Sequence, residues 1–464
     1  MHPTLARDLE TLPDIASAAQ ALAVDYLCNV DAVPAARTPS RQRNAVEADD
    51  VSVGVGAVGA LERFRTQWLP HLSGSAGPRY LGFVTGGSTP ASLVGDWITS
   101  TVDQNPTSNW DSEAPSLERE TVASLAKWFN LPSHTGVFVT GATMSNFVGL
   151  AIAREWVGER RGVHVSTDGL AALGPVRIFA GTPHSSVSKA ASMLGLGRSA
   201  VHRVATLAGR EAMDIDALDV AMTSFNGTCI VVASAGTVNT GDFDDLVQLA
   251  ALKKRHDFWL HVDGAFGAFA ALDATLAPLV AGMDDADSVC IDCHKWMNVP
   301  YDSALQFTKR QDLQVAVFQN AAAYLGNVAS NVTPNFVHLT PENSRRWRAL
   351  AAWFSVVAYG RDGHAEIVSR NVECARLLAT RLGEFKDLVA VVAPVRLNVV
   401  LFTVQGVDDE TKMLVWLQRL TDTHQVFLTP TTYQGQWGVR AAFSNWRTTS
   451  HDVDVVVDAI KSVL

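Results

Sequence analysis

The feature that most constrains the fold is an alternation of short apolar runs with longer helical segments from about residue 116 onward. Strands that alternate with helices form βαβ units, which place parallel strands in one sheet. The sequence therefore predicts an α/β domain with a mostly parallel central sheet and helices on both faces. The expected strands are GVFVT (136–140), VRIFA (176–180), CIVVAS (229–234), FWLHV (258–262) and SVCID (288–292).

The segments on either side of this domain have different patterns. Apolar residues recur at helical spacing in residues 1–30, although Pro13 interrupts them, so we expect a helical arm. After an arginine-rich helix that begins near residue 345, helices and strands follow in an order typical of a smaller α+β domain. A chain of 464 residues that is 47% hydrophobic is long enough for more than one domain. We predict an arm or dimerisation segment over 1–77, a large domain over 78–352 and a small domain over 353–464.

The charge and cysteine content narrow the functional class. The net charge is -10 and no basic run is present, which argues against a nucleic-acid partner. No apolar segment reaches the length of a membrane span, and the first residues do not resemble a secretory signal. Five cysteines, an odd number, indicate reduced thiols. We therefore expect a cytoplasmic protein with no membrane partner.

The stretch CIDCHK (290–295) allows three interpretations. A C-x-x-C pair is found in thiol-redox proteins, and C-x-x-C-H attaches haem in exported proteins. Cys290 lies inside an apolar run instead of at the start of a helix, and no export signal is evident. A zinc site would need a second pair of ligands at matching spacing, which the other cysteines do not supply. We therefore expect both cysteines to be bystanders beside His294 and Lys295, with no metal bound.

Several polar residues follow the predicted strands, at the edge where α/β sheets bind ligands. Small residues around Ala142 and Thr143 lead into a helix and suit a phosphate, although an ordinary helix cap explains them equally well. The other strands are followed by groups of different chemistry, namely His184, Thr237, Asp263 with Ala265, and His294 with Lys295. A phosphate anchor, a stacking ring, a carboxylate for a pyridine nitrogen and a lysine amine together are what pyridoxal 5′-phosphate (PLP) requires.

Five stretches carry a resemblance to a known family. The chain resembles the PLP-dependent group II amino-acid decarboxylases, which include the aromatic-amino-acid, histidine and glutamate decarboxylases. The likeness runs from about Leu61 to the C-terminus. It implies the aminotransferase-like fold of type I PLP enzymes. The similar stretches are DCHKWMNVPYDS, LHVDGAFGAF, TPHSSVSKAASMLGL, SAGTVNTGDFDDL and GVFVTGATMSNFVGLAIAR.

The resemblance also implies roles for individual residues. Lys295 forms the Schiff base with PLP, Asp263 pairs with the pyridine nitrogen, and His184 stacks on the ring. Ala265 packs against the opposite face, and three residues lie around the phosphate, namely Ala142, Thr143 and His294. The segments with Phe83, Thr85 and Trp110 line the substrate pocket. The implied enzyme is a homodimer with a shared active site that forms an external aldimine, releases CO2 and yields an amine.

Three departures from the family pattern affect the expected chemistry. The second threonine of the family's G-T-T is Val238, next to Thr237. A pocket aromatic is replaced by Gly82, so the substrate need not be aromatic. An ungapped count places Phe336 where the family has a proton-donating loop tyrosine, with His338 two residues on. Phenylalanine cannot donate a proton.

The third departure leaves alternatives open. The product is an aldehyde formed by oxidative deamination, or His338 or another group donates the proton, or the loop alignment slips by a few residues. A transaminase or carbon–sulfur lyase on the same fold is a further alternative, against which the H-K-W stretch argues. The last alternative is a non-catalytic member of the family. The presence of Lys295, Asp263 and His184 argues against this alternative.

Overall fold

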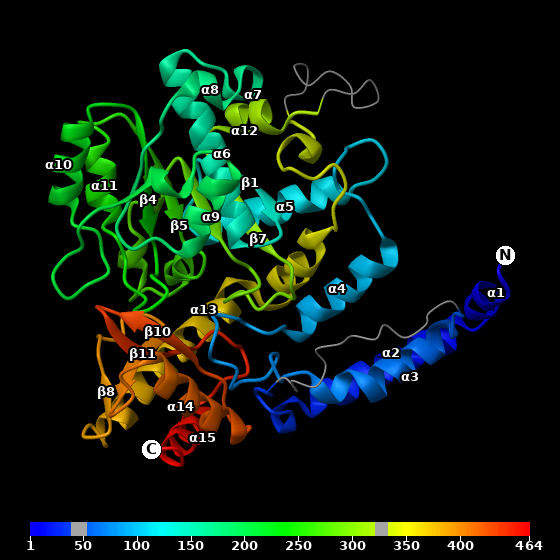
Figure 1. Cartoon of the computed structure of the whole chain (residues 1–464). Helices are drawn as coiled ribbons and strands as arrows, with labels where there is room; N and C mark the ends of the chain where they lie inside the picture. Colours follow the sequence, from blue (N-terminus) through cyan, green and yellow to red (C-terminus); the bar gives the residue numbers. More distant parts are fainter. Residues whose placement is uncertain (39–52, 321–332) are drawn as a thin grey trace.

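The computed structural model describes residues 1–38, 53–320 and 333–464. The chain forms a large α/β domain, a smaller C-terminal domain below it, and an N-terminal helical arm that projects from both (Figure 1). No helix within these ranges is long and apolar enough to cross a membrane.

A central sheet organises the large domain. In the described part of the chain it has seven strands, in the order β1-β7-β6-β5-β4-β2-β3. β7 runs antiparallel to both of its neighbours, and the other adjacent pairs are parallel. The predicted mostly parallel sheet is confirmed. The strands are β1 (Thr135–Val139), β2 (Ile178–Ala180), β3 (Val201–Arg203), β4 (Cys229–Ser234), β5 (Phe258–Asp263), β6 (Ser288–Ile291) and β7 (Ala304–Thr308).

Both faces of this sheet are buried, because helices cover each of them. Successive side chains of a strand point to opposite faces, so each strand contributes to two apolar clusters. On β4, Ile230 and Val232 pack into one apolar cluster, and Val231 and Ala233 into another. The first cluster is covered by α6 (Ala142–Arg161), α9 (Ser185–Met193) and α12 (Gln311–Phe318). The second is covered by α5 (Ala114–Trp128), α10 (Ile215–Phe225), α11 (Leu246–Leu252) and α13 (Arg348–Gly383). The short helices α7 (Val165–Asp168) and α8 (Leu170–Leu173) follow α6.

Helix α13 joins the two domains, and the predicted boundary at residues 352 and 353 falls inside it. It bends at Gly360, whose φ of 60° lies in the left-handed region that glycine adopts without strain. The small domain has an antiparallel sheet in the order β10-β11-β9-β8, packed against α13 and two further helices. Its elements are β8 (Val389–Val391), β9 (Val399–Val404), α14 (Glu410–Asp422), β10 (Thr429–Tyr433), β11 (Gln436–Ala442) and α15 (Ser450–Lys461).

The described part of the N-terminal arm contains the α-helices α1 (Pro3–Glu10), α2 (Leu12–Cys28) and α3 (Gly56–Gln67). α2 and α3 lie side by side in the projecting arm (Figure 1). Apolar side chains remain exposed along it, including Leu5, Leu9 and Phe64. Helix α4 (Pro90–Val102) packs on α13 and follows the segment that leads from the arm into the large domain.

Candidate active site

Four parallel strands of the large sheet end beside one cavity. Ser234 ends β4, Asp263 ends β5, and Lys295 lies in the turn after β6. His184 enters from the start of α9, in the connection after β2. Since the carboxyl ends of parallel strands meet at one edge of a sheet, residues up to about a hundred positions apart line the same space.

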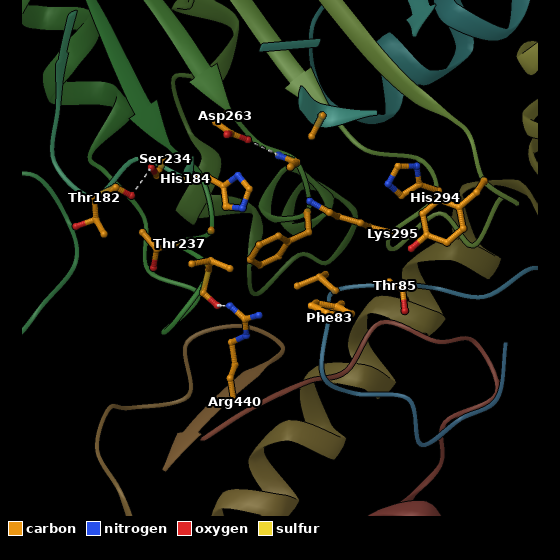
Figure 2. A pocket seen from close by; sticks show the side chains of 17 residues that line it. Phe83, Thr85, Thr182, His184, Ser234, Thr237, Asp263, His294, Lys295 and Arg440 are labelled. Atoms are coloured by element: carbon orange, nitrogen blue, oxygen red, sulfur yellow. Dashed lines mark hydrogen bonds between the residues drawn. The ribbon is translucent and has the colours of Figure 1, made fainter. Parts of the chain in front are cut away.

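The cavity has a volume of about 250 Å³. Figure 2 shows His184, Asp263 and Lys295 around a common space, which Arg440 enters from the side of the small domain. The lining residues are Phe83, Val84, Thr85, Ala142, Thr182, His184, Ser234, Gly236, Thr237, Val238, Asp263, Ala265, Phe266, His294, Lys295, Tyr301 and Arg440.

The turn that carries Lys295 is held by the buried carboxylate of Asp292. Its Oδ1 lies 3.0 Å from His294 Nε2, and its Oδ2 lies 3.3 Å from Lys295 Nζ. Burial disfavours the charged form of Asp292, but Lys295 and His294 outweigh it and hold the pKa of this carboxyl below its usual value. Asp292 therefore orients both the amine and the imidazole at the edge of the cavity.

The segment around Gly86 closes the cavity over this turn. The backbone N–H of Gly86 donates to the carbonyl oxygen of His294 at 3.2 Å. A Cβ at position 86 would lie 1.8 Å from the carbonyl oxygen of Lys295, so this approach requires glycine. The same segment places Phe83 and Thr85 in the cavity wall.

The carboxylate of Asp263 is buried and accepts two hydrogen bonds. Asn146 Nδ2 donates to Oδ2 at 2.9 Å, and the backbone N–H of Ala265 donates to Oδ1 at 3.2 Å. Donors to an ionised carboxylate fix its orientation. Asp263 is therefore held in place at the cavity wall, as a group that pairs with a protonated ring nitrogen must be.

His184 is the N-cap residue of α9. Its Nδ1 accepts from the backbone N–H of Ser186 at 3.3 Å and lies 2.8 Å from Ser186 Oγ, so the ring proton belongs on Nε2. Desolvation lowers the pKa of His184 although one side of the residue is open to the cavity; Asp263 opposes this shift and Lys295 adds to it. The cavity is thus lined by a neutral imidazole, which is free to stack on a planar ligand.

The N-terminus of α6 provides an anion-binding site in the wall of the cavity, beside His294. No side chain caps this 20-residue helix, so its first backbone N–H groups and the positive end of its dipole remain available. Ala142 lines the cavity, and the His294 ring lies beside the preceding Gly141, 3.2 Å from where a Cβ would be. These donors suit a phosphate, so the residues fit the cofactor that the sequence predicts.

Arg440 on β11 is a cavity residue that sequence reasoning missed. Its Nη1 donates to the Val238 carbonyl at 3.1 Å, and its Nη2 donates to the Gly82 carbonyl at 3.3 Å. In the described part of the chain the hydrogen-bond partners of this guanidinium are two backbone carbonyls and the Thr429 hydroxyl, and the residue is 9% exposed. Burial lowers the pKa of Arg440, and Glu211 partly offsets this. A charged residue in the apolar run GVRAAF was the available signal.

Thr237 lines the cavity, but its hydroxyl is engaged on the far side. Its Oγ1 donates to Glu211 Oε2 at 2.5 Å. Thr240 Oγ1 donates to the same carboxylate oxygen of Glu211 at 2.7 Å. Glu211 is 5% exposed and fixes the loop after β4. Val238, where the family has a second hydroxyl, contributes an apolar surface to the cavity.

The structure places Phe336 and His338 away from the cavity. Phe336 is 2% exposed and packs in the core next to two guanidinium groups, with Arg119 Cζ 5.0 Å and Arg345 Cζ 5.1 Å from the ring centroid. His338 is 1% exposed, and its Nδ1 accepts from the backbone N–H of Asn320 at 3.1 Å. Neither side chain reaches the reacting groups in this conformation.

Two further candidates also lie outside the cavity lining. Trp110 is 63% exposed, in the connection between α4 and α5. Thr143 belongs to the first turn of α6 but is not among the lining residues. The residues that the structure does bring together are Phe83, Thr85, Ala142, His184, Thr237, Asp263, Ala265, His294 and Lys295.

Cys290 and Cys293 are buried and unpaired. Burial raises the pKa of both thiols well above the ordinary value; Asp292 adds to the effect at both, and Asp263 adds to it at Cys290. A thiol that stays protonated is a poor nucleophile and a poor redox group. The structure therefore supports the interpretation of both cysteines as bystanders.

Comparison with known proteins agrees with this geometry. A family model for the pyridoxal-dependent decarboxylase conserved domain matches residues 61–405. An aromatic-L-amino-acid decarboxylase of Bacillus atrophaeus is 28% identical over 403 residues, covering 83% of this chain and 81% of the relative. A 3,4-dihydroxyphenylacetaldehyde synthase of Drosophila melanogaster is 27% identical, covering 77% of this chain and 72% of the relative.

A solved structure shows the same fold over nearly the whole length. The crystal structure of Oryza sativa TDC with PLP and tryptamine aligns with a TM-score of 0.89 at 21% identity, covering 98% of this chain and 97% of that one. The chain therefore belongs to the pyridoxal-dependent decarboxylase family, whose enzymes are lyases that use PLP as cofactor.

Proposed function

We propose that the protein decarboxylates an L-amino acid to an amine and CO2, with PLP attached through the amine of Lys295. The observation that carries this proposal is the placement of Lys295 and Asp263 in one cavity, each fixed by its own buried partner. When bound, PLP supplies the electron sink for the bonding electrons that CO2 leaves behind.

Different cavity residues are proposed to hold different parts of the cofactor. Ala142 and His294, which line the cavity, would hold the phosphate, and the backbone of Thr143 in the first turn of α6 would add a donor behind them. His184 and Ala265 would contact the two faces of the ring. Asp263 would pair with the ring nitrogen and keep it protonated, which requires an oriented, ionised carboxylate. Thr237, fixed by Glu211, shapes the remaining wall.

Arg440 supports a carboxylate-bearing substrate. Its guanidinium enters the cavity, and its hydrogen-bond partners within the described residues are all neutral, so an incoming carboxylate would supply a closer counter-charge than Glu211 does. Phe83 and Thr85 form the wall above the Lys295 turn and are proposed to contact the substrate. Trp110 remains a prediction.

An aldehyde product is the second candidate, since one relative is named as an aldehyde synthase. For this chain the expectation rested on Phe336 as the residue in place of a proton-donating tyrosine. Phe336 is buried among Arg119 and Arg345, so its identity does not report on the proton donor. An amine product is therefore the favoured outcome.

The test is a panel of L-amino acids incubated with the PLP-loaded protein, with CO2, ammonia and the organic product read by mass spectrometry. We expect CO2 and a primary amine in equal amounts, and loss of both in Lys295→Ala. Ammonia with an aldehyde would favour oxidative deamination. A product that keeps the carboxylate would favour a transaminase or a lyase, and unchanged turnover in Lys295→Ala would end the proposal.

The functional unit is proposed to be a homodimer that shares its active sites. Exposed apolar residues on the projecting arm, such as Leu5, Leu9 and Leu12, support a second copy of the chain as the covering surface. A cytoplasmic location is also proposed, supported by five free thiols. Light scattering of the full chain should give twice the mass of one chain, and removal of residues 1–77 should abolish that assembly.

A further inference from the structure

A chain of buried hydrogen bonds leads from the core to Asp263. Trp259 Nε1 donates to Ser288 Oγ at 2.9 Å, and Ser288 Oγ lies 2.7 Å from His261 Nδ1. His261 Nε2 lies 2.9 Å from Asn146 Oδ1, and Asn146 Nδ2 donates to Asp263 Oδ2 at 2.9 Å. The other four members of this hydrogen-bond chain are fully buried, at 0% exposure, namely Trp259, Ser288, His261 and Asn146. Solvent therefore does not complete or replace any of these bonds.

The donors in this chain all point the same way. An ionised carboxylate only accepts, so Asn146 presents its N–H groups to Asp263 and its amide oxygen to His261 Nε2. His261 Nε2 must therefore carry the ring proton that goes to this oxygen. In the neutral ring Nδ1 then accepts from the Ser288 hydroxyl, which itself accepts from the indole N–H of Trp259. Bonds aligned in one direction polarise and strengthen one another.

The same amide also holds His184. Asn146 Nδ2 donates a second hydrogen bond to Ser186 Oγ at 3.0 Å, and Ser186 Oγ lies 2.8 Å from His184 Nδ1. One asparagine thus connects the carboxylate that faces the ring nitrogen with the imidazole that faces the ring. A reversed amide would place its oxygen against the carboxylate and leave both partners without a donor.

The fold leaves room for His261 at one specific point. A Cβ at Gly149, in the middle of α6, would lie 2.6 Å from Cε1 and 2.7 Å from Nδ1 of the His261 ring. The imidazole therefore packs against the bare backbone of the helix that also carries Asn146. This packing holds the ring in the plane in which it reaches both Ser288 and Asn146.

We propose that His261 and Asn146 are positioning residues of the cofactor site. His261, as its neutral Nε2–H tautomer, sets the orientation of the Asn146 amide, and Asn146 in turn fixes Asp263 and His184 toward the ring of PLP. This inference rests on the proposed roles of Asp263 and His184 and adds the residues that set their geometry.

A test independent of turnover is nitrogen NMR of the ¹⁵N-histidine-labelled protein without PLP. His261 should give a neutral ring protonated at Nε2, with a proton protected from solvent exchange. In Asn146→Leu that proton should lose its acceptor and its protection. An Nδ1–H tautomer or a charged ring in the unaltered protein at neutral pH would overturn the proposal, whatever the enzyme's activity.

A matched set of variants tests the consequence for the cofactor. His261→Leu removes the donor, whereas His261→Gln keeps an N–H that reaches Asn146. His364→Leu is the control, because His364 is also fully buried and bonded to a serine, Ser355 at 3.1 Å, but lies away from the cavity. We expect PLP to dissociate at least about fivefold more readily from His261→Leu, the effect of one lost buried hydrogen bond. The value for His364→Leu should not change.

Rescue separates positioning from folding. His261→Gln should restore most of the PLP affinity, and the reaction should show a lower kcat in His261→Leu with little change in KM. Equal PLP affinity in folded His261→Leu and the unaltered protein, or a Gln variant as weak as the Leu variant, would refute the role of the donor. Failure of the proposed function would instead appear as no release of CO2 and amine by the unaltered, PLP-loaded protein.

Discussion

The Nζ atom of Lys295 lies 3.3 Å from Oδ2 of Asp292, three residues earlier in the same turn. The carboxylate is almost fully buried, and it also contacts His294 Nε2 through its other oxygen. The amine that is proposed to attach the cofactor is thus oriented by its own turn and not by a distant segment. This arrangement makes Asp292 the residue whose removal most directly disturbs the position of Lys295.

Asp292→Asn is expected to destabilise the PLP-free protein by about 1.5–3 kcal/mol, the range for hydrogen bonds to charged groups. The pKa of Asp292 is lower in the folded chain, so its stabilisation is present above the unfolded value and is lost as pH falls through the folded one. Urea unfolding should therefore show a constant deficit between about pH 5 and 8 that shrinks below about pH 4.

Asp312→Asn is the control for this measurement. Asp312 pairs with Arg310 on the surface, where its side chain is 63% exposed. Exposed pairs contribute about 0–1 kcal/mol, so this variant should unfold close to the unaltered protein. A deficit in Asp292→Asn no larger than in Asp312→Asn would contradict the anchoring role of Asp292.

Arg440→Gln is expected to raise KM by about tenfold to a hundredfold with the best substrate of the panel, because a carboxylate loses a charged hydrogen-bond partner. Arg440→Lys should recover only part of this, since an ammonium lacks the two-pronged geometry of a guanidinium. Steady-state kinetics on folded, PLP-loaded protein measure both effects.

The matched control for Arg440 is Arg154→Gln. Arg154 is also partly buried and donates to a backbone carbonyl, that of Leu194 at 3.1 Å, but it lies on α6 outside the cavity lining. Its replacement should leave KM unchanged. If both variants shift KM equally, Arg440 acts through folding and not through substrate contact.

Phe336→Tyr is expected to leave the ratio of amine to aldehyde unchanged. The side chain is 2% exposed, so the added hydroxyl enters the core and should cost about 1–3 kcal/mol of stability unless it finds a partner. Product analysis and urea unfolding of the same sample separate the two effects. A clear change in product ratio would instead place residue 336 at the reacting atoms.

The sequence predicted those elements of the fold that a continuous run of apolar residues marks. Five continuous apolar runs became β1, β2, β4, β5 and β6, because strands buried on both faces are apolar throughout. β3 was missed because it is an edge strand whose VHR sequence is largely polar and exposed, and β7 was also not predicted. β10 was missed because its TPTTY sequence is polar on an edge strand.

The candidate site divides in a similar way. Lys295, Asp263 and His184 follow strands, so topology alone places them at one edge of the sheet. Arg440 comes from the small domain, and its approach to that edge depends on how the domains pack, which no local pattern reports. Asn146 and His261 are buried partners of site residues, and their roles become visible only once hydrogen-bond distances are known.

The assignment of Phe336 rests on counting along the chain, and it stays a prediction. The expected proton-donor position came from an ungapped count back from the arginine-rich helix, which assumes a loop of fixed length. Loops tolerate insertions and deletions more readily than the elements they connect, so such a count fails where the loop length differs. The sequence also contains Tyr324, which lies outside the described residues.

The stability of the protein should depend on the charge of His261 in mildly acidic solution. Burial lowers the pKa of His261 to about 4, against a value of about 6.5 in the unfolded chain. Between these values the unfolded chain binds more protons, so stability should rise with pH up to about 6.5, by as much as ~3 kcal/mol from this residue. In His261→Gln this contribution is missing, whereas the other buried histidines titrate in both proteins and cancel in the difference. Urea unfolding from pH 4.5 to 7.5 should therefore give a shallower pH dependence for the variant, and parallel curves would mean that His261 is not held neutral by the fold.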